Sequence, residues 1–225
     1  DKAIWMNAEY IRTMPLEELL PHVKGELKGA KLWREEYEPD GRALTATIDS
    51  TEAQAFERGA EIADRPESIA IEPFDVGSHD WCVKTIDLIR ARFFTLKDFS
   101  SQGRAYFSED FDFDPAAVAK NLTKFPELRE CLPELADRFE TEFNKLSPHR
   151  GRGLLPFREE YIEDVVKAFT EEKSTKLGVI MNGARTLLTG VAVGPSMLSV
   201  FEIIGLDRSI IRLKSQIAWN QKADA

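Results

Sequence analysis

The sequence predicts an all-α fold, and three observations support that prediction. Apolar residues recur at helical spacing through most of the 225 residues, almost no sustained apolar/polar alternation occurs, and Pro, Gly, Ser and Asp stand where helices would begin or end. Hydrophobic residues make up 43% of the chain, which is enough to bury a core. We therefore expect helices joined by short connections.

The first quarter of the chain contains two predicted helices followed by a region of weaker pattern. Residues 5–12 form the end of one helix, and a second helix opens on Pro15, where proline is tolerated and the acids after it favour the helix dipole. From residue 31 to residue 48 the periodicity weakens, which predicts a polar connection or a short hairpin. A further helix is expected at residues 50–64, with Ser50 as its cap.

Residues that typically begin or end helices mark the predicted helices in the rest of the chain. Ser78 is a predicted N-cap, Pro115 lies in a first helical turn, and Gly190 is expected to end a helix in the left-handed conformation. Pro133 either kinks a long helix or divides it into two. The clearest loop is at residues 147–153. The helices are predicted at residues 79–92, 115–123, 126–146, about 161–169, 177–189, 196–204 and 207–216.

One arginine lies inside an otherwise uncharged helix near the C-terminal end. Leu177, Ile180, Ala184 and Leu188 belong to the apolar stripe of this helix. Arg185 follows a stripe residue, so its side chain lies on the shoulder of the apolar face. From the residues alone it either points at a ligand or, as is commoner, snorkels or pairs with a carboxylate.

The formal net charge of −9 argues against a nonspecific nucleic-acid binder, because phosphate contacts require positive charge. Any contact with RNA must therefore be local. Each cluster of basic residues is either such a contact or a solvated face balanced by neighbouring acids. The clusters are Arg90 with Arg92, Arg150 with Arg152, Lys173 with Lys176, and Arg208 with Arg212 and Lys214.

Sequence signatures of catalysis and metal binding are missing. The chain contains no GxGxxG, GxxxxGK[ST] or GxSxG pattern, and its three histidines are widely separated. Asp110, Asp112 and Asp114 alternate, but the glycine and terminal glutamate of a calcium loop are absent. A recognition module is therefore favoured over a hydrolase or metalloenzyme.

The cysteines and the apolar runs indicate in which cellular compartment the protein is expected. Cys82 and Cys131 have neither metal-site nor disulfide spacing, which fits a reducing cytosol. The longest uncharged run, residues 187–201, contains two glycines and a proline, so no membrane span is expected. No signal peptide is recognised, and the start at Asp1 suggests a fragment or a processed product.

Short blocks spread over nearly the whole chain resemble one family in the same order. They are WMNAEYIR at residues 5–12, LIRARFFTLKDF at 88–99, YFSEDF at 106–111, FTEEK and KLG at 169–178, ARTLLTG at 184–190, and FEIIG at 201–205. These blocks resemble the C-terminal tRNA-binding half of bacterial-type glutamyl-tRNA synthetases, which are class I aminoacyl-tRNA synthetases. The joint order is more specific than any single block.

The resemblance implies two consecutive helical subdomains that form an anticodon-binding cage. Residues 1–30 then hold the end of the stem-contact region and connecting helices. Residues 31–146 form the first anticodon-binding subdomain, with a poorly matched insert at 31–74, and residues 147–225 form the C-terminal one. The implied partner is tRNA(Glu), bound through its anticodon loop by a monomeric cytoplasmic protein.

The resemblance also implies a parent enzyme that attaches glutamate to tRNA(Glu) with ATP and Mg²⁺. Its HIGH-like and KMSKS-like motifs belong to an N-terminal catalytic domain, and neither motif occurs here. This fragment is therefore expected to need no cofactor and to be inactive alone.

Two arginines match family positions that read the anticodon. Arg92 matches the arginine that distinguishes the third anticodon base of glutamate tRNA from that of glutamine tRNA, and Arg185 matches the second anticodon-contacting arginine. A planar guanidinium can hydrogen-bond the edge of an unstacked base in a fixed plane. Weaker candidates for contacts with the tRNA backbone are Arg90, Lys173 and Lys176.

Two alternatives remain open. The chain could be a helical protein-interaction scaffold that keeps this fold without binding RNA, a reading that the net acidity favours. Phe93, Phe94 and Phe107 could stack on bases, although their spacing favours core packing.

Overall fold

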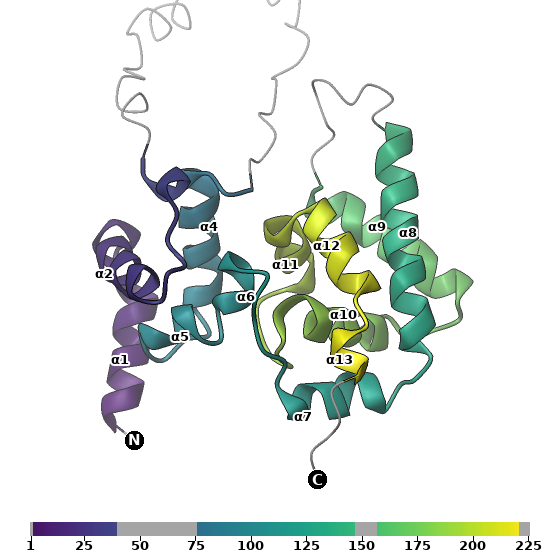
Figure 1. The fold of residues 1–225 in the computed structure, drawn as a ribbon, viewed down its shortest axis with the longest axis horizontal. Coiled ribbons are helices and arrows are strands. Elements are labelled where there is room, and N and C mark those ends of the chain that lie inside the picture. The colour runs from purple at the N-terminus through teal and green to yellow at the C-terminus, as the bar shows by residue number, and fades with distance from the viewer. Residues whose placement is uncertain (1, 40–75, 147–156, 221–225) are drawn as a thin grey trace, which may run out of the picture.

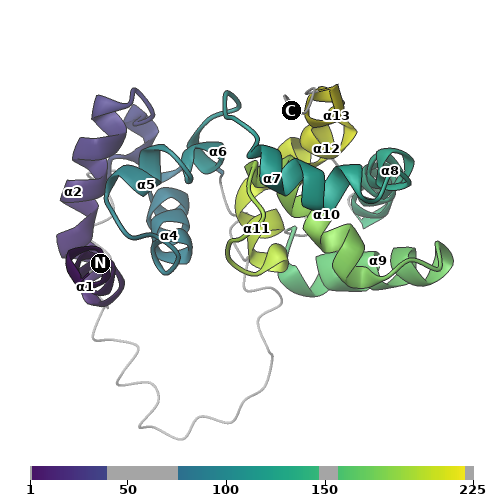
Figure 2. The same ribbon diagram turned by 90° about the horizontal axis from the view of Figure 1, so that it is seen from below.

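The computed structural model describes residues 2–39, 76–146 and 157–220, and these ranges contain helices and no strand, which confirms the all-α prediction. Two groups of helices lie side by side, joined through α6 and the segment that follows it (Figures 1 and 2). The N-terminal half consists of α1 (Lys2–Thr13), α2 (Leu16–Gly29), η1 (Glu35–Tyr37), α4 (His79–Arg90), α5 (Lys97–Ser100) and α6 (Arg104–Phe107).

The C-terminal half surrounds α10. It consists of α7 (Pro115–Val118), the π-turn η3 (Ala119–Thr123), α8 (Leu128–Leu146), α9 (Glu159–Glu172), α10 (Leu177–Thr189), α11 (Met197–Ile204), α12 (Leu206–Lys214) and α13 (Ile217–Asn220). In this half α8 packs against α9, α10 and α12.

The predicted caps are confirmed. Ser78 Oγ accepts a hydrogen bond from Trp81 N (3.2 Å), and Asp114 Oδ1 accepts one from Ala116 N (2.9 Å). Gly190 ends α10 with φ 75°, a conformation that glycine adopts at least cost. α8 runs as one helix through Pro133, so the restart considered from the sequence does not occur.

The structure differs from the prediction at the end of α4 and adds the short helices α5, α6 and α13, and two predicted elements lie outside the described residues. α4 ends at Arg90 rather than at residue 92, because the chain tightens there into i→i−3 bonds, with Arg92 N donating to Ile89 O (3.1 Å). The described part of the region predicted as a polar connection or a short hairpin is a connection that contains η1. The predicted helix at 50–64 and the loop at 147–153 lie outside the described residues.

Contacts at a glycine and at the π-turn fix the position of α10 in the C-terminal half. A Cβ at Gly183 would lie 2.6 Å from Leu128 Cδ1, so the absent side chain lets α8 approach α10. Asn121 of the π-turn donates to Thr186 Oγ1 in the buried interior (3.1 Å). These contacts fix the helix on which Arg185 lies.

Aromatic side chains form the core on both sides of the molecule. In the N-terminal half Tyr37, Trp81 and Phe107 pack with ring centroids 5.6 to 6.3 Å apart. Trp81 also donates from Nε1 to the carbonyl of Ile203 in α11 (2.7 Å), a buried hydrogen bond that joins the two halves.

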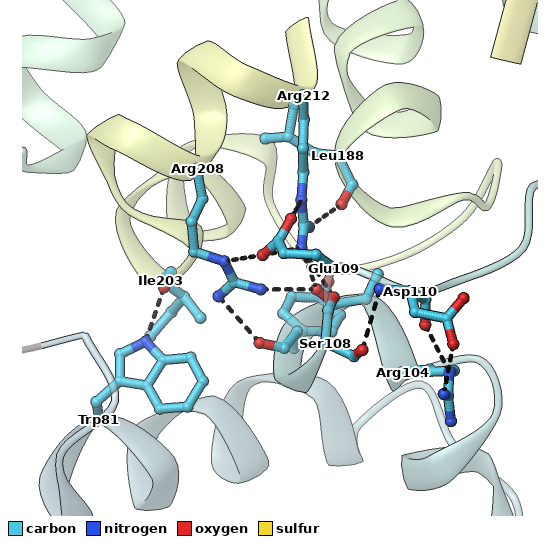
Figure 3. Close-up of polar contacts among 11 residues, drawn as sticks. Trp81, Arg104, Ser108, Glu109, Asp110, Leu188, Ile203, Arg208 and Arg212 are labelled. Atoms are coloured by element: carbon cyan, nitrogen blue, oxygen red, sulfur yellow. Dashed lines mark hydrogen bonds and ion pairs between the residues drawn. The ribbon is translucent and has the colours of Figure 1, made fainter. Parts of the chain in front are cut away.

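The strongest polar link between the halves is Arg212 of α12, whose side chain is only 4% exposed (Figure 3). Nη1 donates to the carbonyl of Leu188 in α10 (2.5 Å), and Nη2 donates to the carbonyls of Ala105 (2.8 Å) and Ser108 (3.1 Å) at the end of α6. The Glu109 carboxylate accepts from Nε (3.0 Å) and Nη2 (2.9 Å). One guanidinium thus binds both halves.

Arg208, one helical turn earlier, completes this junction (Figure 3). It donates from Nε to Glu109 (2.5 Å), from Nη1 to the carbonyl of Tyr106 (3.1 Å) and from Nη2 to that of Ala105 (3.2 Å). Burial would raise the pKa of Glu109, but hydrogen bonds and charges from Arg212 and Arg208 outweigh it and lower that pKa. The carboxylate is therefore held in its charged form.

We predict opposite effects of Gly→Ala changes at the two ends of α10. Gly190→Ala should lower the free energy of unfolding by about 2 kcal/mol or more, because φ is positive and the new Cβ would lie 2.2 Å from Asp112 O. Gly178→Ala should raise it by up to about 1 kcal/mol, since that glycine meets no atom within 4 Å. Urea unfolding midpoints of the two variants measure both changes. Free energies of unfolding that change in the same direction in both variants contradict the prediction.

We also predict that Glu109 contributes stability that is lost in acid. Its pKa is lowered from the ordinary value of 4.5, so its contribution is full at neutral pH and disappears as pH falls through the folded-state pKa. The difference in unfolding free energy between the unsubstituted chain and Glu109→Gln should therefore shrink below about pH 4.5. Urea titrations at several pH values test this, and a constant difference contradicts it.

Candidate nucleic-acid interface

A pocket of about 330 Å³ lies between the two halves of the molecule. Its volume falls in the range of sites for small organic groups, and a nucleobase fits in that range. The N-terminal half supplies Arg12, Ile89, Ala91, Arg92, Phe93, Phe94, Gln102 and Tyr106, and the C-terminal half supplies Val191, Val193, Gly194 and Pro195.

Arg92 lies in the turn after α4, and neighbouring hydrogen bonds hold this turn. The Asp98 carboxylate accepts from Phe94 N (2.8 Å) and Thr95 N (2.9 Å), and Asn7 donates to the carbonyl of Phe94. Arg92 itself is exposed and, among the described residues, has no carboxylate partner. A fixed backbone thus presents a free guanidinium at the pocket.

Arg185 lies behind the opposite wall. Its Nη2 donates to the carbonyl of Pro195 (2.7 Å), while Nη1 is buried and has no hydrogen-bond partner among the described residues. A Cβ at Gly194 would lie 2.7 Å from Nη1, so the missing side chain makes room for the guanidinium. A buried N–H without an acceptor costs free energy, so this nitrogen is an unused hydrogen-bond donor beside the pocket.

The two guanidinium groups are close enough to influence each other. Burial lowers the pKa of Arg185; Tyr106 opposes this, and the positive charge of Arg92 lowers it further. Tyr106 is buried, and burial raises the pKa of its phenol to about 12, so it stays protonated at neutral pH. Arg92 lines the pocket and Arg185 lies behind the opposite wall, so positive charge lies on both sides of it.

The weaker candidates do not line the pocket. Arg90 donates to the carbonyl of Met14 (2.8 Å) and pairs with Asp87 (2.8 Å), so it fastens α4 to the α1–α2 connection. Lys173 pairs with Glu134 and Lys176 is exposed at the start of α10. The structure therefore brings Arg92 and Arg185 together and places Arg90, Lys173 and Lys176 elsewhere.

The phenylalanines divide between core and surface. Phe93 and Phe107 are buried, whereas Phe94 is 47% exposed and lines the pocket. Its ring is therefore the one of these three that can stack on a base.

Sequence reasoning did not single out Arg12 or the wall formed by Gly194 and Pro195. Arg12 closes the first block, at the end of α1, and its position after an aromatic residue and an isoleucine was the available signal. At Gly190 and the residues that follow it, the sequence pattern indicated only where a helix ends. Its role as a pocket wall depends on the packing of the two halves, which no local pattern records.

Other classes of site find little support in the part of the chain that the structure describes. No group of three His, Cys, Asp or Glu side chains there could hold a metal ion, and both cysteines are free. No helix in the described ranges has the length and apolar character needed to cross a bilayer.

Comparison with known proteins gives consistent matches. The chain matches the family described as "Anticodon binding domain" over residues 69–217, more than half of its length. It is 36% identical to the glutamate–tRNA ligase of Desulfotalea psychrophila and 32% identical to glutamate–tRNA ligase 2 of Koribacter versatilis, each over 95% of this chain and 33% of the relative. The chain thus spans about a third of the length of these relatives.

A crystal structure of a glutamate–tRNA ligase from Elizabethkingia meningosepticum in complex with its amino acid has the same fold. The TM-score is 0.56 at 22% identity, over 93% of this chain and 30% of that one. The matched family region contains Arg92, Arg185 and most residues that line the pocket. Because the family match covers more than half of the chain, the chain belongs to the anticodon-binding domain family.

Proposed function

We propose that this chain recognises the anticodon loop of tRNA(Glu) through the pocket between its two halves. The observation that carries the proposal is the buried Nη1 of Arg185, which has no acceptor among the described residues and lies beside a pocket that Arg92 lines. An unstacked base supplies acceptors on its edge and an apolar face for Phe94.

The donors at the pocket suggest which base it accepts. The third anticodon base is cytosine in glutamate tRNA and guanine in glutamine tRNA. On its Watson–Crick edge cytosine presents two acceptors, N3 and O2, and one donor at N4, whereas guanine presents two donors, at N1 and N2, and one acceptor, O6. Because arginine carries donors and no acceptor, guanidinium groups at this edge favour cytosine.

We infer that the parent protein is a glutamate–tRNA ligase, since the relatives carry that name and this chain spans about a third of their length. Attachment of glutamate with ATP and Mg²⁺ then belongs to a catalytic domain outside this chain. We propose a monomeric, cytoplasmic enzyme in which this part recognises tRNA and performs no chemistry.

A protein-interaction scaffold without RNA binding is the second candidate. The net charge of −9 and the internal pairing of Arg90 and Lys173 favour it. The two candidates differ in salt dependence, because anticodon recognition predicts an affinity for RNA hairpins that falls steeply as salt rises. Absence of binding at low salt favours the scaffold.

We predict that Arg92→Ala abolishes the preference for cytosine at the third anticodon position. The unsubstituted chain should bind a glutamate-type anticodon hairpin roughly 5- to 150-fold more tightly than the same hairpin with guanine there, the range of one good base contact. The variant should bind the two hairpins almost equally. Fluorescence anisotropy at fixed salt measures both affinities.

Arg34→Ala is the matched control for Arg92→Ala. Arg34 is also exposed in the N-terminal half, but it does not line the pocket. It should keep the preference for cytosine. Loss of the preference in both variants would show that general positive charge, not position 92, is responsible.

We predict that Arg185→Lys weakens binding of both hairpins by about tenfold. A lysine ammonium lacks the planar fork that holds Pro195 O with one nitrogen and leaves the other for a ligand. Arg138→Lys, which alters an ion pair between α8 and α9 away from the pocket, is the control. Similar affinities of the two variants would contradict a role for Arg185.

A further inference from the structure

We propose that Arg212, oriented by Glu109, is a positioning residue that sets the separation between the two walls of the base pocket. Arg212 does not line the pocket itself. The inference rests on the proposed function, because spacing matters only if a base enters between the walls.

This one guanidinium binds the backbone of the two helices that lead into the walls, α6 on one side and α10 on the other. On one side, the carbonyls of Ala105 and Ser108 flank Tyr106, which lines the pocket. On the other side, the carbonyl of Leu188 lies three residues after Arg185 on α10. A shift of Arg212 therefore changes the distance between Tyr106 and Arg185.

The chemistry of the link requires arginine. Its rigid, planar fork donates in three directions at once, to α6, to α10 and to Glu109. A lysine at this position has a single nitrogen and cannot reach all three partners in that plane. The Phe111 ring, 4.7 Å from the guanidinium carbon, covers the group and limits its movement.

Glu109 fixes the orientation of the fork. Its two carboxylate oxygens bind Arg212 and also Arg208, and Arg208 donates to the carbonyls of Ala105 and Tyr106. α6 has only four residues, so its own helical bonds cannot hold it in place. The two arginines of α12 supply the hydrogen bonds that α6 lacks at its C-terminal end.

Separate contacts join the halves at other points. Trp81 donates to the carbonyl of Ile203 (2.7 Å), and around this bond α4 packs against α11. Weakening Arg212 should therefore leave the halves attached while changing their spacing near the pocket. This separates a positioning role from a purely structural one.

The test compares Arg212→Lys in this chain with Arg129→Lys, which alters an arginine that joins α8 to α13 away from the pocket. Affinities are measured for glutamate-type anticodon hairpins with cytosine or guanine at the third position, and folding is checked by thermal unfolding. We expect the cytosine preference of Arg212→Lys to fall about fivefold or more, the value of one hydrogen bond. Arg129→Lys should keep the preference.

The ratio of the two affinities is the decisive measurement, because partial unfolding lowers both affinities equally and leaves their ratio unchanged. An unchanged ratio in a folded Arg212→Lys overturns the inference. If that variant does not fold, Glu109→Gln gives the same test, because it retains the arginine and removes the carboxylate that orients it: a lowered ratio supports the inference and an unchanged one overturns it. If the unsubstituted chain binds neither hairpin, the proposed function fails and the inference with it.

Discussion

The molecule depends on a buried guanidinium that lies where two groups of helices meet. A buried charge is costly unless every donor is used, and Arg212 uses its donors on two carbonyls of one half, one carbonyl of its own half and the Glu109 carboxylate. Desolvation lowers the pKa of Arg212, while its bond to Glu109 supports the charged form. The halves are thus joined by a directional contact, whereas apolar packing alone would tolerate sliding.

An acidic protein can still present a local positive site while other cations pair internally with carboxylates. Arg90, Arg104, Arg138 and Lys173 each pair with a carboxylate. The pocket keeps Arg92 without such a partner, with Arg185 just behind its wall. Recognition by hydrogen bonds to one or two bases needs this arrangement far more than it needs overall positive charge.

Local sequence patterns predicted the helices well and long-range contacts poorly. Ser78, Asp114 and Gly190 act within one turn of the backbone, so their roles follow from neighbouring residues. Arg208 and Arg212 were noted only as a basic cluster, because their partners lie about a hundred residues earlier in the chain. The all-α fold and the family are confirmed, and the roles of the site residues remain predictions.

A substitution at Gly194 would change the pocket indirectly, through the position of Arg185. The missing side chain of this glycine leaves room beside the buried Nη1 of Arg185, because a Cβ there would lie 2.7 Å from that nitrogen. Even a methyl group there would push the guanidinium away from its present place. Selection acting on this one position could therefore alter which base edge the arginine meets, and the arginine itself would stay the same.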